Sequence, residues 1–400
     1  MTMPGRAGLA LAALLAATAC SGGAKKKVKK PAPPITATAD QLMIDARAAA
    51  KAGDIDTADA KYQEAEKLDL KLEIVKEHVE LLLAHGRGDG AVAAAKGYYE
   101  AKPSDSNGSL VYANALIGAG DFTTAIEIAN EVVELQSTNP AAYNARGRAL
   151  VGAGKADQAL DDLRKATELE PQNEEYQLSY GIGLEKNNNI DEAALILRSL
   201  AKKHQDAPNP RVLVHLGVLS RAQDEIKEGI GYLQQATQAD PNMAEAWYNL
   251  ALAQNDFGDN YEAEISAAKA ATLEPGNGQY QYVYGEMLRI NKKPEEAKAA
   301  YQKALDARPP APKAAAKMAG VLYEAGQYAE AEVFLTDMIG KDPGNPGLYY
   351  NLGWVYSAQK KYKLGVDAFE KYLELASKED KDRPKAQAEI KSMKKKGGLK

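Results

Sequence analysis

The sequence contains few of the residues that cross-link a fold or carry out chemistry. Its 400 residues include one cysteine, four histidines, two tryptophans and four phenylalanines. The single cysteine, Cys20, excludes an internal disulfide and a paired-cysteine redox motif. Because large aromatic rings other than tyrosine are so few, a core has to be built from small side chains and tyrosine, which suits closely spaced helices.

Basic residues are outnumbered by acidic ones over most of the chain. Residues 1–30 hold six basic groups, residues 391–400 hold five, and neither segment holds an acidic one. Residues 31–390 therefore carry 39 basic against 55 acidic side chains. Because so acidic a body repels a phosphate backbone, we expect no nucleic-acid partner.

Recognisable catalytic and metal-binding motifs are missing as well. The chain has no glycine-rich phosphate loop, no Gly-x-Ser-x-Gly turn and no His-Glu-x-x-His string. His78 and His85 are seven residues apart, about 10 Å along a helix, which is too far to share one metal ion. Acidic pairs such as Glu295 and Glu296 suit helix starts and solubility. We therefore expect a protein that is not an enzyme and that needs no metal and no cofactor.

A 34-residue repeat is the strongest pattern that the sequence does contain. A small residue recurs at this period, and only the steps from 58 to 91 and from 193 to 229 differ, at 33 and 36 residues. Such a period indicates one supersecondary unit stacked many times, because each unit buries its apolar face only against its neighbours. The recurring residues are Ala58, Ala91, Ala125, Ala159, Ala193, Gly229, Ala263, Ala297, Ala331 and Gly365.

Within each unit the apolar residues form two helical stripes. Unit positions 4, 7, 8 and 11 share one face of a first helix, and positions 20, 24 and 27 share one face of a second. Small residues at positions 8 and 20, such as Gly217 and Gly229, predict that the two helices approach closely. In the clearest unit, positions 4, 7, 8, 20, 24, 27 and 32 are Trp247, Leu250, Ala251, Ala263, Ala267, Ala270 and Pro275.

This pattern resembles the tetratricopeptide repeat. The resemblance implies an all-α, right-handed superhelical α-solenoid. We count about ten helical hairpins over residues 39–379. Residues 380–400 are expected to form a C-terminal capping helix and a basic tail, because Ala386, Ile390 and Met393 recur there at helical spacing.

The N-terminal segment carries a targeting pattern. An apolar run from Leu9 to Ala19 is too short to span a bilayer. The small residues immediately before Cys20 resemble a bacterial lipoprotein signal. The resemblance implies that residues 1–19 are removed and that Cys20 is acylated and inserted in a membrane; a plain secretory cleavage is the alternative.

The residues that follow the cysteine indicate where such an anchor would lie. By analogy with enterobacterial lipoproteins, Ser21 implies anchoring in the outer membrane, on its periplasmic face. Residues 20–38 are rich in lysine and proline and are expected to form a disordered tether. At about 3 Å per residue, this tether would reach roughly 50 Å from the lipid.

One side of the first helices is the candidate partner-binding surface. A helical wheel turns unit positions 2, 5, 9 and 12 to this side, and the resemblance implies that it is a concave groove that binds peptides or protein segments. Tyrosine, tryptophan and arginine often anchor interfaces. The alternative is that Tyr248, Tyr282 and Tyr350 only fill gaps between neighbouring first helices. The candidate groove residues are Tyr248, Asn255, Tyr282, Arg289, Tyr323, Tyr350 and Trp354.

These features together favour a lipid-anchored interaction scaffold of the bacterial envelope. The chain resembles the outer-membrane tetratricopeptide lipoproteins that help assemble the secretin channels of type IV pili. Adaptors for cell-wall hydrolases and scaffolds of motility or polysaccharide-export complexes fit equally well. The rival hypothesis is a glycan-binding or glycan-processing envelope protein, in which the groove aromatics stack on sugar rings.

Overall fold

The computed structural model describes residues 37–204, 206–307, 310–311 and 313–399. Every regular element in this part of the chain is an α-helix. The helices are α1 (Ala39–Lys51), α2 (Ile55–Leu68), α3 (Leu72–Ala84), α4 (Gly88–Ala101), α5 (Ser106–Ala119), α6 (Phe122–Leu135), α7 (Pro140–Gly152), α8 (Ala156–Leu169), α9 (Glu174–Lys186), α10 (Ile190–Lys203), α11 (Pro210–Ala222), α12 (Ile226–Ala239), α13 (Ala244–Phe257), α14 (Asn260–Leu273), α15 (Gly278–Ile290), α16 (Pro294–Asp306), α17 (Ala314–Glu324), α18 (Tyr328–Lys341), α19 (Pro346–Ala358), α20 (Tyr362–Leu375) and α21 (Arg383–Gly397).

The first helix of a hairpin often begins at a polar cap that is visible in the sequence. Asn139 precedes Pro140, and its side-chain oxygen accepts hydrogen bonds from the backbone N–H groups of Ala141 and Ala142. Asparagine satisfies N–H groups that have no partner inside the helix, while proline at the first position lacks an N–H and has a preset φ. Asn209 and Asn345 start α11 and α19 in the same way, so these helix starts are encoded locally.

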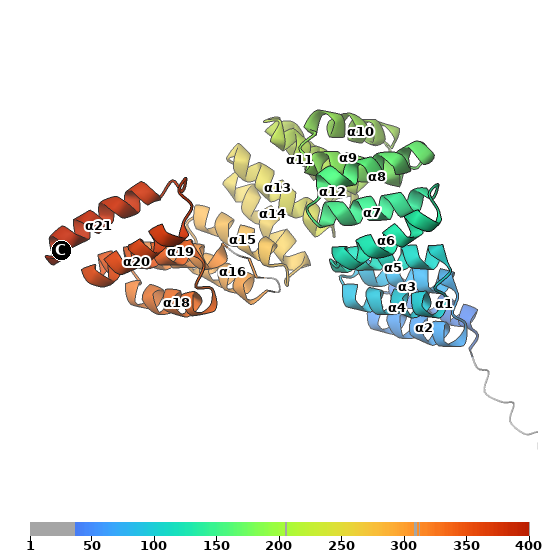
Figure 1. Ribbon diagram of the computed structural model, residues 1–400, viewed down its shortest axis with the longest axis horizontal. Coiled ribbons are helices and arrows are strands. Elements are labelled where there is room, and N and C mark those ends of the chain that lie inside the picture. Colours follow the sequence, from blue (N-terminus) through green and yellow to red (C-terminus); the bar gives the residue numbers. More distant parts are fainter. Residues whose placement is uncertain (1–36, 205, 308–309, 312, 400) are drawn as a thin grey trace, which may run out of the picture. The chain divides into compact units, whose positions relative to one another are not determined.

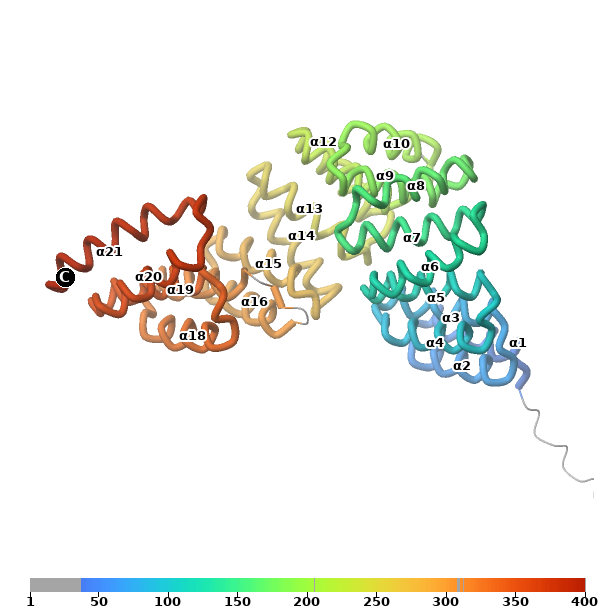
Figure 2. The backbone as a smooth tube through the Cα atoms, in the orientation of Figure 1, coloured from blue at the N-terminus to red at the C-terminus, as the bar shows by residue number. Residues whose placement is uncertain are grey.

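The helices pair into ten hairpins, α1 with α2 through α19 with α20, as the repeat predicted (Figure 1). Two compact units are distinguished by their contacts, with the boundary between Leu70 and Lys71. The first unit contains the α1–α2 hairpin. The second contains the other nine hairpins and α21, and its helices pack one after another along the chain (Figure 2).

All ten turns inside the hairpins share one backbone feature. Each contains a residue with positive φ, at the same place in the repeat. This left-handed conformation ends a helix sharply, and glycine adopts it without a steric penalty. The residues are Gly53, Gly86, Gly120, Gly154, Asn188, Asp224, Gly258, Lys292, Gly326 and Lys360.

The close approach predicted at unit positions 8 and 20 is confirmed. The alanines that mark the repeat are completely buried. A Cβ atom added to Gly217 would lie 2.9 Å from both Cδ atoms of Leu233, and one added to Gly229 would lie 2.9 Å from the Gly217 carbonyl oxygen. Real Cβ atoms essentially never come that close to another atom. The two helices of this hairpin therefore pack at a distance that only glycine permits.

The predicted capping helix is present as α21, which packs against α20. Ala386 and Met393 are completely buried, and Ile390 packs against the same core. The Arg383 side chain donates hydrogen bonds to the carbonyl oxygens of Leu373 and Ala376 at the end of α20. It thereby satisfies backbone groups that a helix C-terminus leaves without partners.

Candidate partner-binding face

Most first helices of neighbouring hairpins in the second unit contact one another directly. In the second unit, each first helix from α3 to α13 contacts the next first helix, and α17 contacts α19. No two second helices have comparable contact in the part of the chain that the structure describes. We call the surface of α3, α5, α7, α9, α11, α13, α15, α17 and α19 the first-helix face. Side chains from successive repeats can act together on it.

All seven candidate groove residues are half-buried, and all lie on first helices. Their half-buried state agrees both with a binding surface and with the gap-filling alternative, so their contacts have to separate the two. The candidates are Tyr248 and Asn255 on α13, Tyr282 and Arg289 on α15, Tyr323 on α17, and Tyr350 and Trp354 on α19.

Tyr248 and Tyr282 belong to an aromatic group on α13 and α15. The ring of Tyr248 lies 5.0 Å from that of Tyr280, centroid to centroid, and Gln279 Nε2 donates to the Tyr248 hydroxyl at 3.3 Å. Tyr282 lies 6.1 Å from the ring of Tyr301. Burial, and then the nearby Glu286 carboxylate, raise the pKa of Tyr282 to about 12. Tyr248 and Tyr282 are half-buried, so each can contact a partner through the exposed part of its ring.

Arg289 is engaged by its own helix. Its guanidinium donates to the Glu286 carboxylate at 3.4 and 3.5 Å, and Lys317 on α17 donates to the same carboxylate at 2.9 Å. The Tyr301 hydroxyl donates to it as well. Burial alone would raise the pKa of Glu286, but the hydrogen bonds from Tyr301 and Lys317 outweigh burial, and the pKa lies below its usual range. Arg289 therefore helps to hold a half-buried carboxylate in its ionised form.

Tyr350 and Trp354 pack against the core at the C-terminal end. Tyr350 lies 5.8 Å from the ring of Phe369 and 5.0 Å from that of Tyr372, and Trp354 lies 5.5 Å from Phe369. Phe369 is completely buried, and the same cluster contains Met393 of α21. The structure therefore assigns these two aromatics a packing role at the cap, whatever part they take in binding.

Polar contacts between neighbouring first helices were not predicted from the sequence. Arg148 Nη1 donates to Asn114 Oδ1 at 3.1 Å, and Arg211 Nη1 donates to the Glu175 carboxylate at 3.0 and 3.1 Å. The partners in these two contacts are 34 and 36 residues apart, which is about one repeat. A search for complementary side chains one period apart would have found them.

His215 on α11 was not predicted to have a partner, yet its Nδ1 lies 2.6 Å from Glu185 Oε2 on α9. Both side chains are largely buried, with exposed fractions of 12% and 5%. Burial opposes ionisation of Glu185, but His215 and Lys186 outweigh it and lower its pKa. His78 is buried in α3.

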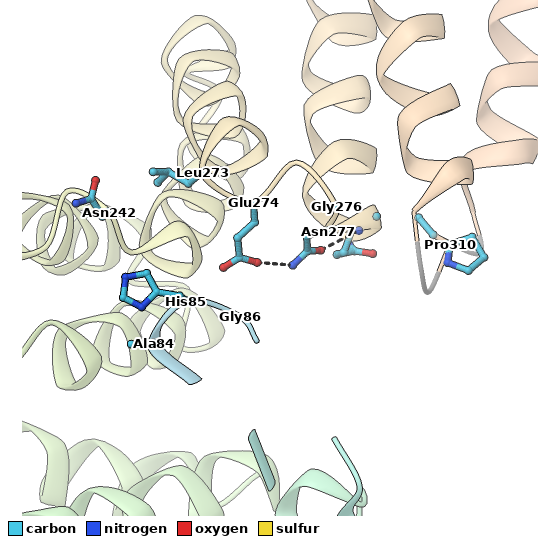
Figure 3. A pocket seen from close by; sticks show the side chains of 12 residues that line it. Ala84, His85, Gly86, Asn242, Leu273, Glu274, Gly276, Asn277 and Pro310 are labelled. Carbon is cyan, nitrogen blue, oxygen red and sulfur yellow. Dashed lines mark hydrogen bonds between the residues drawn. The ribbon is translucent and has the colours of Figure 1, made fainter. Parts of the chain in front are cut away.

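A cavity of about 1010 Å³ is lined by the turn after α3 and by the loops that follow α12, α14 and α16 (Figure 3). Its polar groups are used locally. Asn277 Nδ2 donates to Glu274 at 3.0 Å, and Asn277 Oδ1 caps the start of α15. His85 Nδ1 lies 2.8 Å from the Leu81 carbonyl oxygen. These groups stabilise turns and helix ends and do not converge on a reacting atom.

Two further features bear on membranes and metals. None of the helices in the described ranges is long and apolar enough to cross a bilayer. Within the same ranges, no three histidine, cysteine or acidic side chains are grouped closely enough to hold a metal ion. Cys20 and the apolar run before it lie outside the described residues.

Comparison with known sequences finds the repeat in most of the chain. One family model described as tetratricopeptide repeat matches residues 150–213, 288–339 and 322–390, and a second with the same description matches 76–140 and 216–278. Human (Homo sapiens) tetratricopeptide repeat protein 7B is 27% identical over 133 residues. That alignment covers 33% of this chain but only 16% of the human protein.

Solved structures share the fold at low sequence identity. The APC/C hetero-tetramer Cut9–Hcn1 contains a chain that is 13% identical, with 89% of this chain and 76% of that chain covered and a TM-score of 0.50. The human IFIT1 dimer with m7Gppp-AAAA is also 13% identical, with 85% and 90% covered and a TM-score of 0.50. Proteins with this repeat and fold are typically non-catalytic scaffolds for protein–protein interaction. The chain belongs to the tetratricopeptide repeat family.

Proposed function

We propose that this protein is a scaffold, anchored by lipid in the outer membrane of a bacterium, that holds a protein segment on its first-helix face. The observation that carries the proposal is the group of half-buried aromatic and charged side chains on α11, α13 and α15. A partner that covers such side chains buries large area at low entropy cost. The family supports a protein partner, because its repeats indicate interaction scaffolds.

The envelope location rests on the sequence around Cys20. A small-residue motif before this cysteine supports acylation, and Ser21 supports export to the outer membrane, on its periplasmic face. A tether over residues 20–38 would let the helical part reach a partner at a distance from the lipid. We propose a role in assembling or positioning an envelope machine, of which a type IV pilus secretin, a motility or export complex and the cell-wall machinery are the candidates.

The membrane anchor is tested by Cys20→Ser. We expect this variant to move from the membrane fraction to the soluble fraction, because acyl chains contribute about 0.8 kcal/mol per buried methylene and weak peripheral contacts cannot replace them. Labelling with a radioactive fatty acid should be lost in the same variant. If Cys20→Ser still sediments with membranes after a high-salt wash, the lipid-anchor proposal is wrong.

The binding face is tested by crosslinking in cells. We expect Tyr248→Ala combined with Tyr282→Ala to lose the captured partner, since removing an interface anchor typically costs about 2 kcal/mol of binding or more. The matched control is Tyr261→Ala on α14, where the tyrosine is 69% exposed and lies on a second helix. Circular dichroism must show normal helicity for both. Normal capture by a folded double variant, or equal loss in the control, would place the binding site elsewhere.

A further inference from the structure

A small pocket on the first-helix face lies apart from the large cavity and from the cap. It has a volume of about 230 Å³ and is lined by residues of four successive first helices, α9, α11, α13 and α15. This is smaller than the roughly 300–1,000 Å³ of pockets for drug-sized ligands. The pocket can therefore take one side chain but not a folded segment.

The acidic groups of the pocket differ in whether they have a partner. Glu185 is ionised, but Lys186 pairs with it at 2.8 Å and His215 bonds to its other oxygen. Glu245, at the rim of the pocket, is exposed. Its carboxylate has no hydrogen bond or ion pair with any residue that the structure describes. Glu245 is therefore the charged group of the lining that is left without a partner in the described part of the chain.

One tyrosine of the lining, Tyr280, reports the negative potential of nearby carboxylates. Tyr248 and Tyr280 present rings whose centroids are 5.0 Å apart. Burial raises the pKa of Tyr280, and the carboxylates of Glu274 and Glu245 raise it further. Carboxylates that oppose ionisation of a phenol stabilise a positive charge at the same place. Tyrosine faces also attract cations.

The hydrogen-bond groups of the pocket fit the same occupant. An ionised Glu185 can only accept, so the His215 ring donates to it from Nδ1. Lysine and arginine side chains carry only donors. An anionic side chain would meet the carboxylates of Glu245 and Glu185, and Lys186 already pairs with Glu185.

We propose that this pocket, between Glu185, His215, Glu245, Tyr248 and Tyr280, binds the side chain of a lysine or arginine of the partner. This proposal rests on the proposed function, because both take the partner to be a protein. It adds that the segment bound at the pocket is basic. Its occupant would place a cation between the tyrosine rings and the Glu245 carboxylate. The acidic excess of residues 31–390 would attract a basic segment over longer distances.

The test uses the full-length purified protein and small probes, so it requires no knowledge of the partner. The measurement is the NMR signal of the histidine rings in protein labelled with 13C at histidine Cε1. The chain has four histidines, so these signals are few, and the signal that disappears in His215→Gln is that of the pocket. The probes are the Nα-acetyl N-methylamides of lysine, arginine and norleucine. We expect the lysine and arginine probes to shift the His215 signal saturably at millimolar concentration, and norleucine, which has a hydrocarbon chain and no charge, to leave it unchanged.

Two variants show whether the charge of Glu245 is responsible. Glu245→Gln should weaken binding of the lysine probe about threefold to fivefold, as expected for the loss of one exposed charge pair. The control, Glu262→Gln, removes the same charge from the first turn of α14, the next helix, and should leave binding unchanged. Both glutamates are exposed, so both variants should fold.

Three results would overturn the proposal: no shift of the His215 signal by either basic probe, an equal shift by norleucine, or equal affinities for the Glu245 and Glu262 variants. The proposed function can fail separately. If a folded Tyr248 and Tyr282 double variant still captures the partner, the first-helix face is not the docking site. The wild-type protein could still bind the free lysine probe in that case.

Discussion

Gly217 provides a sharp test of how the hairpins pack. It lies on α11, where an added Cβ would come within 2.9 Å of both Cδ atoms of Leu233 on α12, a side chain that is completely buried. Gly231 lies on α12 of the same hairpin, and an added Cβ there meets nothing within 4 Å. The same substitution, glycine to alanine, is therefore expected to have opposite effects at two sites in one hairpin.

The magnitudes follow from two competing effects. Alanine in place of glycine inside a helix gains about 0.5–1 kcal/mol, because the unfolded chain loses less conformational freedom on folding. At Gly231 this gain should be seen in full. At Gly217 it is opposed by overpacking, which costs about 1–3 kcal/mol. We expect Gly217→Ala to be less stable than Gly231→Ala by about 2 kcal/mol.

Urea denaturation followed by far-ultraviolet circular dichroism measures both variants. A double variant, Gly217→Ala with Leu233→Ala, isolates the clash, since Leu233→Ala alone should cost about 2–5 kcal/mol and the added methyl group should recover at least about 1 kcal/mol of it. If Gly217→Ala is as stable as Gly231→Ala, or if the two changes in the double variant are additive, the close approach between α11 and α12 is wrong.

Three further predictions concern polar groups and turns. Arg146 Nε and Nη2 each donate to Asp162 at 2.7 Å, and the Asp162 side chain is 11% exposed, so Asp162→Asn should lower the free energy of unfolding by about 1–2 kcal/mol. The Asp161 side chain is 85% exposed, so the control Asp161→Asn should change it by less than about 0.5 kcal/mol. Equal effects of the two variants in a urea titration would contradict the burial of the pair. The pKa of Glu286 is lowered in the folded state, so its ionised form stabilises the fold at pH values above the unfolded pKa of about 4.3, and this contribution is lost as pH falls through the lower folded pKa. The difference in urea midpoint between wild type and Glu286→Gln should therefore shrink below about pH 4. A difference that stays constant with pH would show that the pKa of Glu286 is not lowered by folding. Lys292 and Lys360 have positive φ, so replacing either by glycine should stabilise the protein by about 0.5–1 kcal/mol. The reverse change at an equivalent turn, Gly326→Lys, should destabilise it by about 1–2 kcal/mol. Thermal unfolding that ranks these variants in the reverse order would show that the turns are not strained.

Most of the fold could be predicted because the repeat encodes its own packing. The residue that must be small, such as Gly217, and the residue that packs against it, Leu233, both recur with the period of the hairpin. One hairpin therefore predicts the next. The sequence has an Ala-Gly pair at four of the ten turns, whereas the lysines at positions 292 and 360 take the same conformation without that signal.

The candidate site was less predictable, since a helical wheel gives only the direction of a side chain from its own axis. It turned Tyr350 and Trp354 to the same side as Tyr248 and Tyr282. It could not show that these two pack against Phe369 in the cluster that also holds Met393 of α21. The pair formed by Glu185 and His215 depends on side-chain conformations across two hairpins, which the spacing of acidic and basic residues does not determine.

The neighbour-to-neighbour packing of the helices has a consequence for how the chain folds. Within each compact unit, the principal contacts join a helix to the next one, or to the next but one, so no distant segment has to be brought in before apolar surface is buried. Chains dominated by such local contacts have low contact order and fold fast. A hairpin can close as soon as its second helix is available, and each closed hairpin is a template for the next. We therefore expect folding to proceed progressively from the N-terminal side while the chain is still emerging from a ribosome or a translocation pore, with only the most recently added hairpin exposing its unburied face.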